Sequence, residues 1–240
     1  MTPAEILDSV FPAGHDLATE GDLLFGRAKF GDGIVHVVGA TGRAPIGIDQ
    51  AIRLSAAVLA IASTDDGAPI LFLVDSASQR MSRRDELLGL SEYLAHLAKS
   101  LLLAEARGHR TIGLLYGGSA AGAFIATALA CGTLVALPGA HPEVMDLASM
   151  ARVTKLPEAM LTALSESNPV FAPGVGNYVA MGGVRALWEG DLPAALREAL
   201  AGTPTEDLRA RDGAERGGRR LAAEAHGPHP HGPGQGKHRG

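Results

Sequence analysis

This chain has little of several features by which protein classes are recognised, and each scarcity excludes something. It holds one cysteine, Cys131, in 240 residues, so no disulfide can form within the chain and a reducing, cytoplasmic location is expected. Lys and Arg number 21 against 26 Asp and Glu, and the net charge of -5 argues against a nucleic-acid binder. Aromatic residues make up 4%, so the core must be built from Ala, Leu, Val and Ile.

Long apolar runs are also missing. Residues 51–62 come closest to a membrane span, but they include Arg53 and Ser55 and fall short of the roughly 18 residues that a spanning helix needs. The first residues show no basic segment followed by an apolar core, so no signal peptide is expected. Cysteine and histidine do not occur at the spacing of a structural zinc site, and we expect no bound metal.

The apolar periodicity that is present predicts an α/β domain with a parallel sheet and flanking helices. Runs typical of strands occur at 30–38, 69–75, 112–116 and 133–137. Helical spacing occurs at 2–10, 48–62, 84–107, 142–150, 157–165 and 193–201. Strands that alternate with helices imply right-handed crossovers, and ligands of such sheets bind beyond the carboxyl ends of the strands.

The composition changes near Gly202. The chain beyond it is charged, then rich in glycine, proline and histidine, and it has too few apolar residues to form a core. We therefore assign residues 1–202 to one domain and expect residues 203–240 to be a disordered polar tail.

The stretch from Thr111 to Cys131, TIGLLYGGSAAGAFIATALAC, is the most informative part of the chain. An apolar strand ends at two glycines, Gly117 and Gly118, and Ser119 leads into a predicted helix of small residues. A strand that turns into a helix on glycines leaves backbone N–H groups unpaired and directed at one point. Such a point suits a bound anion or a developing oxyanion.

Two other interpretations of this turn stay open. Ser119 is a candidate nucleophile, because GGSAA matches the pattern G-x-S-x-G except at its last position. The sequence offers no obvious histidine and acid to complete such a triad. Alternatively, the turn is only structural, and Ser119 is the N-cap of the helix that follows.

Two further segments are expected near this turn. Asp75, Ser76 and Ala77 follow a buried strand, where they either supply one more N–H donor or simply end the strand in a turn. His141 follows the predicted strand at 133–137. It is a candidate for donating to a substrate carboxylate or for proton transfer, with an ordinary loop histidine as the alternative.

Other motifs are weaker. Arg80, Arg83 and Arg84 form a basic cluster that suits a phosphate or carboxylate ligand, or else a solvated helix start. The glycines of 39–47 are spaced wrongly for G-x-G-x-x-G, so no dinucleotide site is expected there. A second glycine-rich turn at 181–184 suits a pocket wall, a partner interface or a mobile loop.

Two segments carry a family resemblance. VDSASQRMSRRDE, followed after a long helix by TIGLLYGGSAAGAFIATALACGTLVALPGAHPEVMDLASMARVTKLPE, resembles the gamma subunit of malonate decarboxylase. The similarity covers about residues 5 to 200, and the GGSAAGAF and ASMARVTKLPE parts are the most specific. The resemblance implies a carboxyltransferase-type domain of the crotonase/ClpP-like fold, a spiral of ββα units with its active site at an interface between paired subunits.

The resemblance also implies a function. Such a subunit forms a heterodimer or larger assembly with a beta subunit and acts as a malonyl-S-acyl-carrier-protein decarboxylase, a carboxy-lyase of malonate catabolism. The acyl group is carried on the CoA-like phosphopantetheine arm of an acyl carrier protein, an acyl-carrier-protein transferase belongs to the same complex, and this chain itself binds no cofactor. By position, the family's oxyanion turn falls on Gly117, Gly118 and Ser119, and Asp75–Ala77 stands where related folds place another donor. We take Asp75, Ser76 and Ala77 as substrate-binding candidates, and add His141 for its own chemistry.

Three alternatives to this assignment remain. A related version passes the carboxyl group to a biotin protein instead of releasing carbon dioxide. A serine hydrolase on a similar fold would use Ser119 as its nucleophile. A non-catalytic scaffold would only complete the pocket of its partner.

Overall fold

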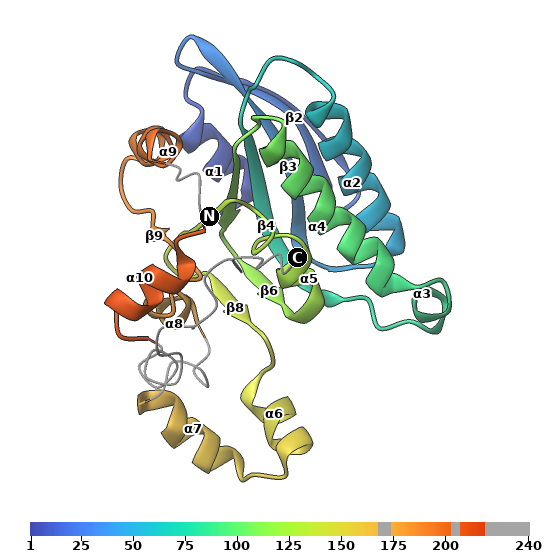
Figure 1. The fold of residues 1–240 in the computed structure, drawn as a ribbon, viewed down its shortest axis with the longest axis vertical. Helices are drawn as coiled ribbons and strands as arrows, with labels where there is room; N and C mark the ends of the chain where they lie inside the picture. Colours follow the sequence, from blue (N-terminus) through green and yellow to red (C-terminus); the bar gives the residue numbers. More distant parts are fainter. Residues whose placement is uncertain (168–173, 203–206, 219–240) are drawn as a thin grey trace, which may run out of the picture.

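The computed structural model describes residues 1–167, 174–202 and 207–218. Within them, a seven-stranded sheet forms the centre of the fold (Figure 1), in the order β1-β2-β3-β4-β5-β7-β9. Its strands are β1 (His15–Glu20), β2 (Leu23–Phe30), β3 (Gly33–Ile46), β4 (Ile70–Gln79), β5 (Thr111–Leu115), β7 (Thr133–Ala136) and β9 (Ala186–Leu187). The first three strands pair antiparallel and the rest parallel, so the sheet is mixed rather than wholly parallel.

Helices cover both faces of this sheet. On one face α2 and α4 lie side by side with α5 at their end, and α1 and α9 lie together on the other face (Figure 1). The helices are α1 (Pro3–Val10), α2 (Ile48–Ala62), α3 (Arg83–Leu87), α4 (Leu90–Ala106), α5 (Ala121–Ala126), α6 (Leu147–Thr154), α7 (Glu158–Ser167), α8 (Val175–Ala180), α9 (Leu192–Ala201) and α10 (Arg209–Glu215).

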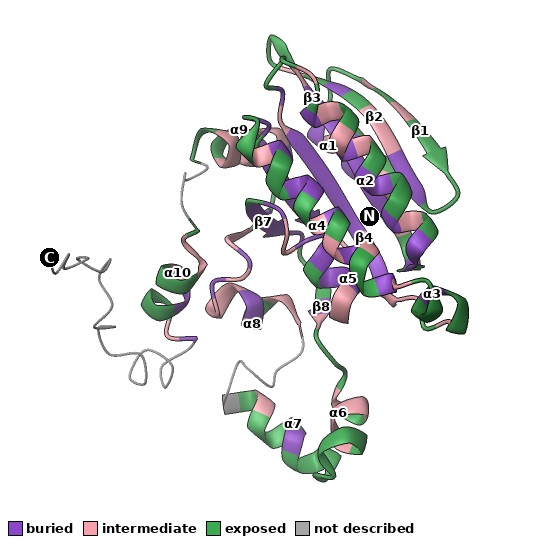
Figure 2. Cartoon of the chain, turned by 45° about the vertical axis from the view of Figure 1, so that its right-hand side comes forward, coloured by how far each residue is buried: buried purple, intermediate pink, exposed green. Residues whose placement is uncertain are grey.

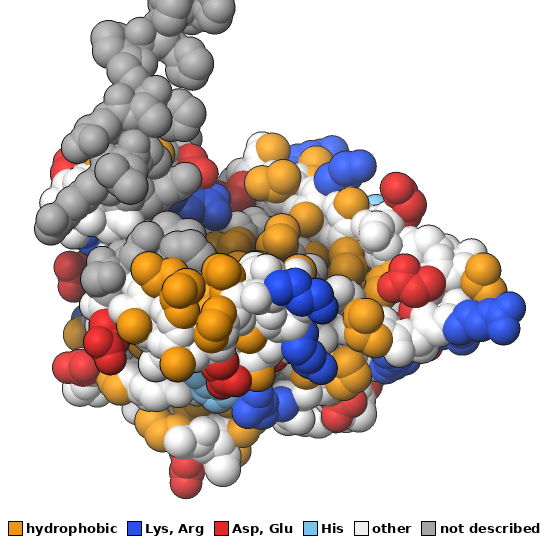
Figure 3. Space-filling view, turned by 90° about the horizontal axis from the view of Figure 1, so that it is seen from below, with side chains coloured by type: hydrophobic (Ala, Val, Ile, Leu, Met, Phe, Trp, Pro, Cys, Tyr) orange, Lys and Arg blue, Asp and Glu red, His pale blue; other side chains and the backbone are white. Residues whose placement is uncertain are grey.

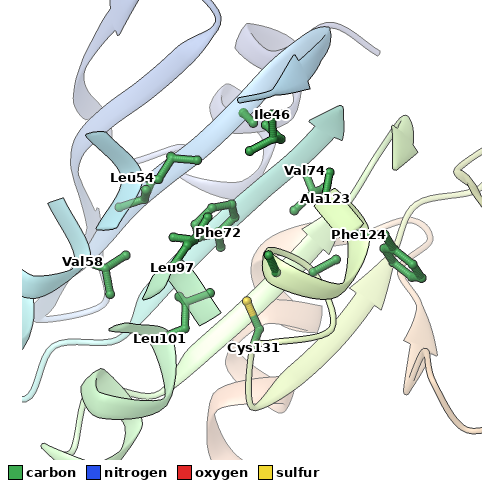
Figure 4. Packing of buried hydrophobic residues seen from close by; sticks show 14 of the residues in the cluster. Ile46, Leu54, Val58, Phe72, Val74, Leu97, Leu101, Ala123, Phe124 and Cys131 are labelled. Carbon is green, nitrogen blue, oxygen red and sulfur yellow. The ribbon is translucent and has the colours of Figure 1, made fainter. Parts of the chain in front are cut away.

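The two layers of the core follow from the alternation of side chains along β4. Phe72 and Val74 are buried against α2 and α4, whereas Leu71 and Leu73 are buried in the layer that faces α1 and α9. Figure 4 shows Phe72 packed beside Leu97 of α4. Because both faces are covered, the central strands are buried along most of their length (Figure 2), as their continuous apolar runs predicted.

The structure corrects several predicted boundaries. The long helix expected at 84–107 is two helices, α3 and α4, because Gly89 between them adopts a left-handed φ of 83°. The helix expected at 142–150 begins later, after a short strand β8 (His141–Glu143) that pairs in parallel with β6 (Gly118–Ala120). The hairpin of β1 and β2 was not predicted, because its alternating polar residues leave β1 largely exposed.

The folded part extends beyond the predicted boundary at residue 202. Helix α10 lies inside the segment expected to be disordered, yet Arg209 donates to the Leu129 carbonyl at 2.8 Å and Arg216 donates to the Val184 carbonyl at 3.0 Å. The glycine turn expected at 181–184 serves this packing, since a Cβ on Gly182 would overlap the backbone of α10. Residues 203–206 and 219–240 of the predicted tail lie outside the described residues.

An arm leaves the body at β8. Helices α6 and α7 project away from the sheet (Figures 1 and 2). Of the described side chains on these two helices, only that of Leu161 is buried. Figure 3 looks onto the arm from below and shows hydrophobic side chains gathered on it. The exposed large ones on the arm and on the segment leading to it are Val144, Met145, Val153, Leu156, Met160 and Leu164. None of the helices described is long and apolar enough to cross a membrane.

A buried histidine is expected to make stability depend on pH. Burial of His36 lowers its pKa below the ordinary value of 6.5, partly offset by its hydrogen bond to Asp66. The unfolded chain therefore binds more protons just below pH 6.5, and stability is lost as the pH falls through that range. We expect the thermal unfolding midpoint of the natural chain to fall between about pH 7.5 and 5.5 more steeply than that of H36Q. Equal slopes in a calorimetric series would contradict this.

Candidate active site

The predicted site residues meet at the carboxyl ends of β4 and β5. The Gly118 amide donates a hydrogen bond of 2.9 Å to Oδ1 of Asp75. Asp75, Ser76 and Ala77 do not form a loop, because β4 continues to Gln79. Their segment faces the Gly117–Gly118 turn as predicted, but Asp75 brings a side-chain acceptor where a backbone donor was expected.

Close packing explains the glycine at position 117. A Cβ built there would overlap the Asp75 carboxylate, so no larger residue fits without displacing that side chain. Among the residues described, no acceptor is bonded to the Gly117 amide. The turn therefore presents one amide without an acceptor beside a second that is already bonded to an anion.

The predicted helix does not begin at Ser119. Residues 118–120 form the strand β6, and α5 begins at Ala121 with Ala120 at its N-cap and no side-chain capping bond. Because β6 pairs with β8, the backbone of Ser119 belongs to a two-stranded ladder rather than to an open turn. This removes Ser119 from the set of free amides and rules it out as the N-cap.

The Ser119 side chain is not placed as a nucleophile. Its hydroxyl lies 3.0 Å from the hydroxyl of Ser76, and both residues are almost fully buried. No histidine in the described part of the chain is within hydrogen-bond distance of it. A serine activated for acyl transfer needs such a base, so this geometry does not support the hydrolase alternative.

His141 stands on the other side of the turn. Its Nδ1 lies 3.2 Å from the Gly139 carbonyl, which only accepts, so Nδ1 carries the proton of the neutral ring. Nε2 points to Gly118 and lies 3.1 Å from where a Cβ on that residue would be. Nε2 is therefore an acceptor when the ring is neutral and a donor when the ring is protonated.

Tyr116 completes this edge, and sequence reasoning missed it. Its hydroxyl is buried without a hydrogen-bond partner among the described residues. Burial raises the pKa of the phenol, and the negative charge of Asp75 raises it further. Its ring also lines a cavity of about 330 Å³ together with Leu137 and Trp188. Its position directly after an apolar strand was the available signal.

The basic cluster of the sequence lies elsewhere and is largely paired within the chain. Arg84 makes two hydrogen bonds to the Asp49 carboxylate, at 2.9 and 3.1 Å, and Arg80 donates to Gln50 at 2.9 Å. These bonds tie α3 to the start of α2, which does not support the predicted ligand site there. The described residues also contain no group of three metal-ligating side chains.

Comparison with known proteins gives this site a context. A family model for the malonate decarboxylase gamma subunit matches residues 41–227. A malonyl-S-ACP:biotin-protein carboxyltransferase of Malonomonas rubra is 31% identical over 155 residues, which cover 60% of this chain and 52% of that protein. The chain thus spans about half the length of this curated relative.

Solved structures agree with the family match. A Pseudomonas malonate decarboxylase hetero-tetramer in complex with coenzyme A contains a chain that is 26% identical, with 91% of this chain and 97% of that one covered at a TM-score of 0.74. A Pseudomonas MdcD-MdcE hetero-dimer gives 27% identity, the same coverage and a TM-score of 0.73. Transcarboxylase 12S, 17% identical, matches 85% of this chain and 42% of that one at a TM-score of 0.70. The predicted crotonase-like carboxyltransferase fold is confirmed.

Proposed function

This chain belongs to the family of malonate decarboxylase gamma subunits, and from that premise we propose that it pairs with a beta subunit to form a malonyl-S-acyl-carrier-protein decarboxylase. The observation that carries the proposal is the turn at Gly117 and Gly118, where an amide binds a carboxylate at the carboxyl edge of the sheet. There a single backbone amide, that of Gly118, holds a carboxylate oxygen.

Decarboxylation needs this kind of site. When the C–C bond of a malonyl thioester breaks, its electron pair moves into an enolate whose charge rests on the thioester oxygen. Preorganised N–H donors stabilise that charge, and one such donor is worth about 2.7–4 kcal/mol. We assign this role to the amide of Gly117 and, once Asp75 turns away, to that of Gly118. The bond from the Gly118 amide to the Asp75 carboxylate supports this assignment, because it places a negatively charged oxygen against this amide.

The two walls of the turn would orient the substrate. Asp75, Ser76 and Ala77 form the β4 side, and His141 forms the other. A protonated His141 offers Nε2–H to the malonyl carboxylate and, after carbon dioxide has left, to the carbon that becomes the acetyl methyl group. The reaction consumes one proton, and this ring is suitably placed to supply it.

The acyl group would arrive from outside this chain. We propose that an acyl carrier protein presents it on a phosphopantetheine arm, that an acyl-carrier-protein transferase belongs to the same complex, and that this chain binds no cofactor. The apolar arm of α6 and α7 is the surface that we assign to the beta subunit, because it continues directly from β8 at the site.

The direct test is reconstitution. Purified alone, the chain should release almost no carbon dioxide from malonyl-acyl carrier protein. Mixed with its beta subunit, it should turn over at a rate that saturates at one beta subunit per chain. A beta subunit that is equally active alone would contradict a catalytic role for this chain and favour the scaffold alternative.

Carboxyl transfer to biotin is the second candidate, since the curated relative from Malonomonas rubra is named for that reaction. A pull-down of the intact complex from its host, followed by mass spectrometry, separates the two. A biotinyl protein in the complex would favour transfer. Its absence, with acyl carrier protein present, would favour direct release of carbon dioxide.

A further inference from the structure

A bulge in β3 lies directly opposite Asp75. Ala40 pairs with Val74 and Ala44 pairs with Ser76, so three residues of β3 span the distance that Asp75 covers alone on β4. Bulges of this kind redirect a side chain out of its regular place in the strand. Here the redirected residue is Arg43.

The backbone at the bulge is strained to achieve this. Gly42 has a φ of 70° and Arg43 a φ of 54°. Both lie in the left-handed region, which residues other than glycine and asparagine rarely adopt. Such strain persists only where the surrounding structure holds it, and it is concentrated at functional sites.

The result is that a guanidinium reaches the proposed active site. Nε of Arg43 lies 3.3 Å from the position that a Cβ on Gly118 would take. Nε2 of His141 lies 3.1 Å from the same position. Two cationic or protonatable groups, from β3 and β8, therefore flank the turn that already binds a carboxylate.

Arg43 also lacks a counter-ion. Among the described residues no acidic side chain lies within 4.0 Å of its guanidinium, whereas Arg53, Arg80 and Arg84 each have one. Even the nearby Asp75 is turned to the Gly118 amide instead. An exposed, unpaired guanidinium at an anion-binding turn suits a planar carboxylate, which it can hold through two parallel hydrogen bonds.

We propose that Arg43 binds the free carboxylate of the malonyl group and makes the site selective for a dicarboxylic acyl thioester over an acetyl one; this rests on the proposed function of the site. The carboxylate is lost as neutral carbon dioxide while its electron pair passes to the enolate, so the attraction to Arg43 is greatest in the bound substrate. Arg43 thus acts on substrate binding more than on the chemical step. The acetyl product carries no carboxylate for Arg43 to bind, so it is released more readily than the substrate.

The test uses the complex with the beta subunit and the variant R43G. Glycine accepts the left-handed backbone, so the bulge is retained and only the cation is removed. We expect the KM for malonyl-acyl carrier protein to rise about tenfold or more with kcat changed less than about threefold. R43K should recover part of the loss. The matched control is R107Q, which should leave both constants unchanged. Arg107 is exposed at the C-terminal end of α4, just before the start of β5, whereas the turn lies after the end of β5.

Calorimetric titration of the complex with malonate and with acetate makes the test independent of turnover. Malonate binding should weaken in R43G and not in R107Q, and acetate binding should be the same in all proteins. Loss of kcat at unchanged KM, or no change in malonate affinity, would overturn the assignment of Arg43. A natural complex that binds malonate through Arg43 but releases no carbon dioxide would overturn the proposed function and leave the carboxylate site standing.

Discussion

Replacing Gly117 by alanine is expected to lower decarboxylation by the reconstituted complex by about 100-fold or more, which is as much as the loss of one oxyanion donor, although alanine keeps the amide of residue 117. The added methyl group would take the place of the Asp75 carboxylate oxygen beside the Gly118 amide. It would therefore block the position that we assign to the negatively charged thioester oxygen of the enolate. Single-turnover release of carbon dioxide from malonyl-acyl carrier protein measures this directly, because it separates the chemical step from product release.

The control for this substitution is G33A. Gly33 begins β3 in the hairpin with β2, and a Cβ there meets only the Phe30 carbonyl at 3.9 Å, an ordinary contact. G33A should keep full activity. G117A should still co-purify with the beta subunit, although loss of the bond between Asp75 and the Gly118 amide is expected to lower its free energy of unfolding by about 1–2 kcal/mol. A G117A complex with normal turnover would show that the turn does not stabilise the enolate.

The sequence was sufficient to predict the central sheet and its covering helices because burial dominates there. The run Ile70–Val74 is apolar at every position, which only a strand covered on both faces requires. The marginal strands were missed for the opposite reason. β9 has two residues, and its place beside β7 depends on the path of the chain around them rather than on its own composition.

The site was predictable only in part. Asp75 and Gly117 were brought together correctly because the carboxyl ends of neighbouring parallel strands must meet. Neither the bond from the Gly118 amide to Asp75 nor the strand β6 was predicted, since both depend on contacts across 23 or 43 residues of sequence. Arg43 was missed because its direction is set by a bulge in β3 that places three residues opposite one, and no local pattern specifies on which residues a bulge falls.

The arm of α6 and α7 makes the last prediction, and it concerns assembly. Val153 and Met160 are 69% and 50% exposed, one on each helix, and the arm leaves the body directly after the β8 strand of the site. Exposing apolar side chains to water is unfavourable. Burying them against a partner lowers the free energy by about 25 cal/mol for each Å² of apolar surface removed from water. A charge introduced there would have to be desolvated in the interface.

The double variant V153E/M160E is therefore expected to lose the beta subunit and, with it, nearly all decarboxylation, while its own fold is kept because neither side chain lies in the core. Analytical ultracentrifugation of the mixed subunits measures the association, and circular dichroism checks the fold. L102E is the matched control, since Leu102 is 59% exposed on α4, away from the arm. An isolated chain with unchanged secondary structure and no partner would fit the proposal. Undiminished association of the double variant would instead mean that the beta subunit binds another face and that the apolar residues of the arm serve something other than this interface.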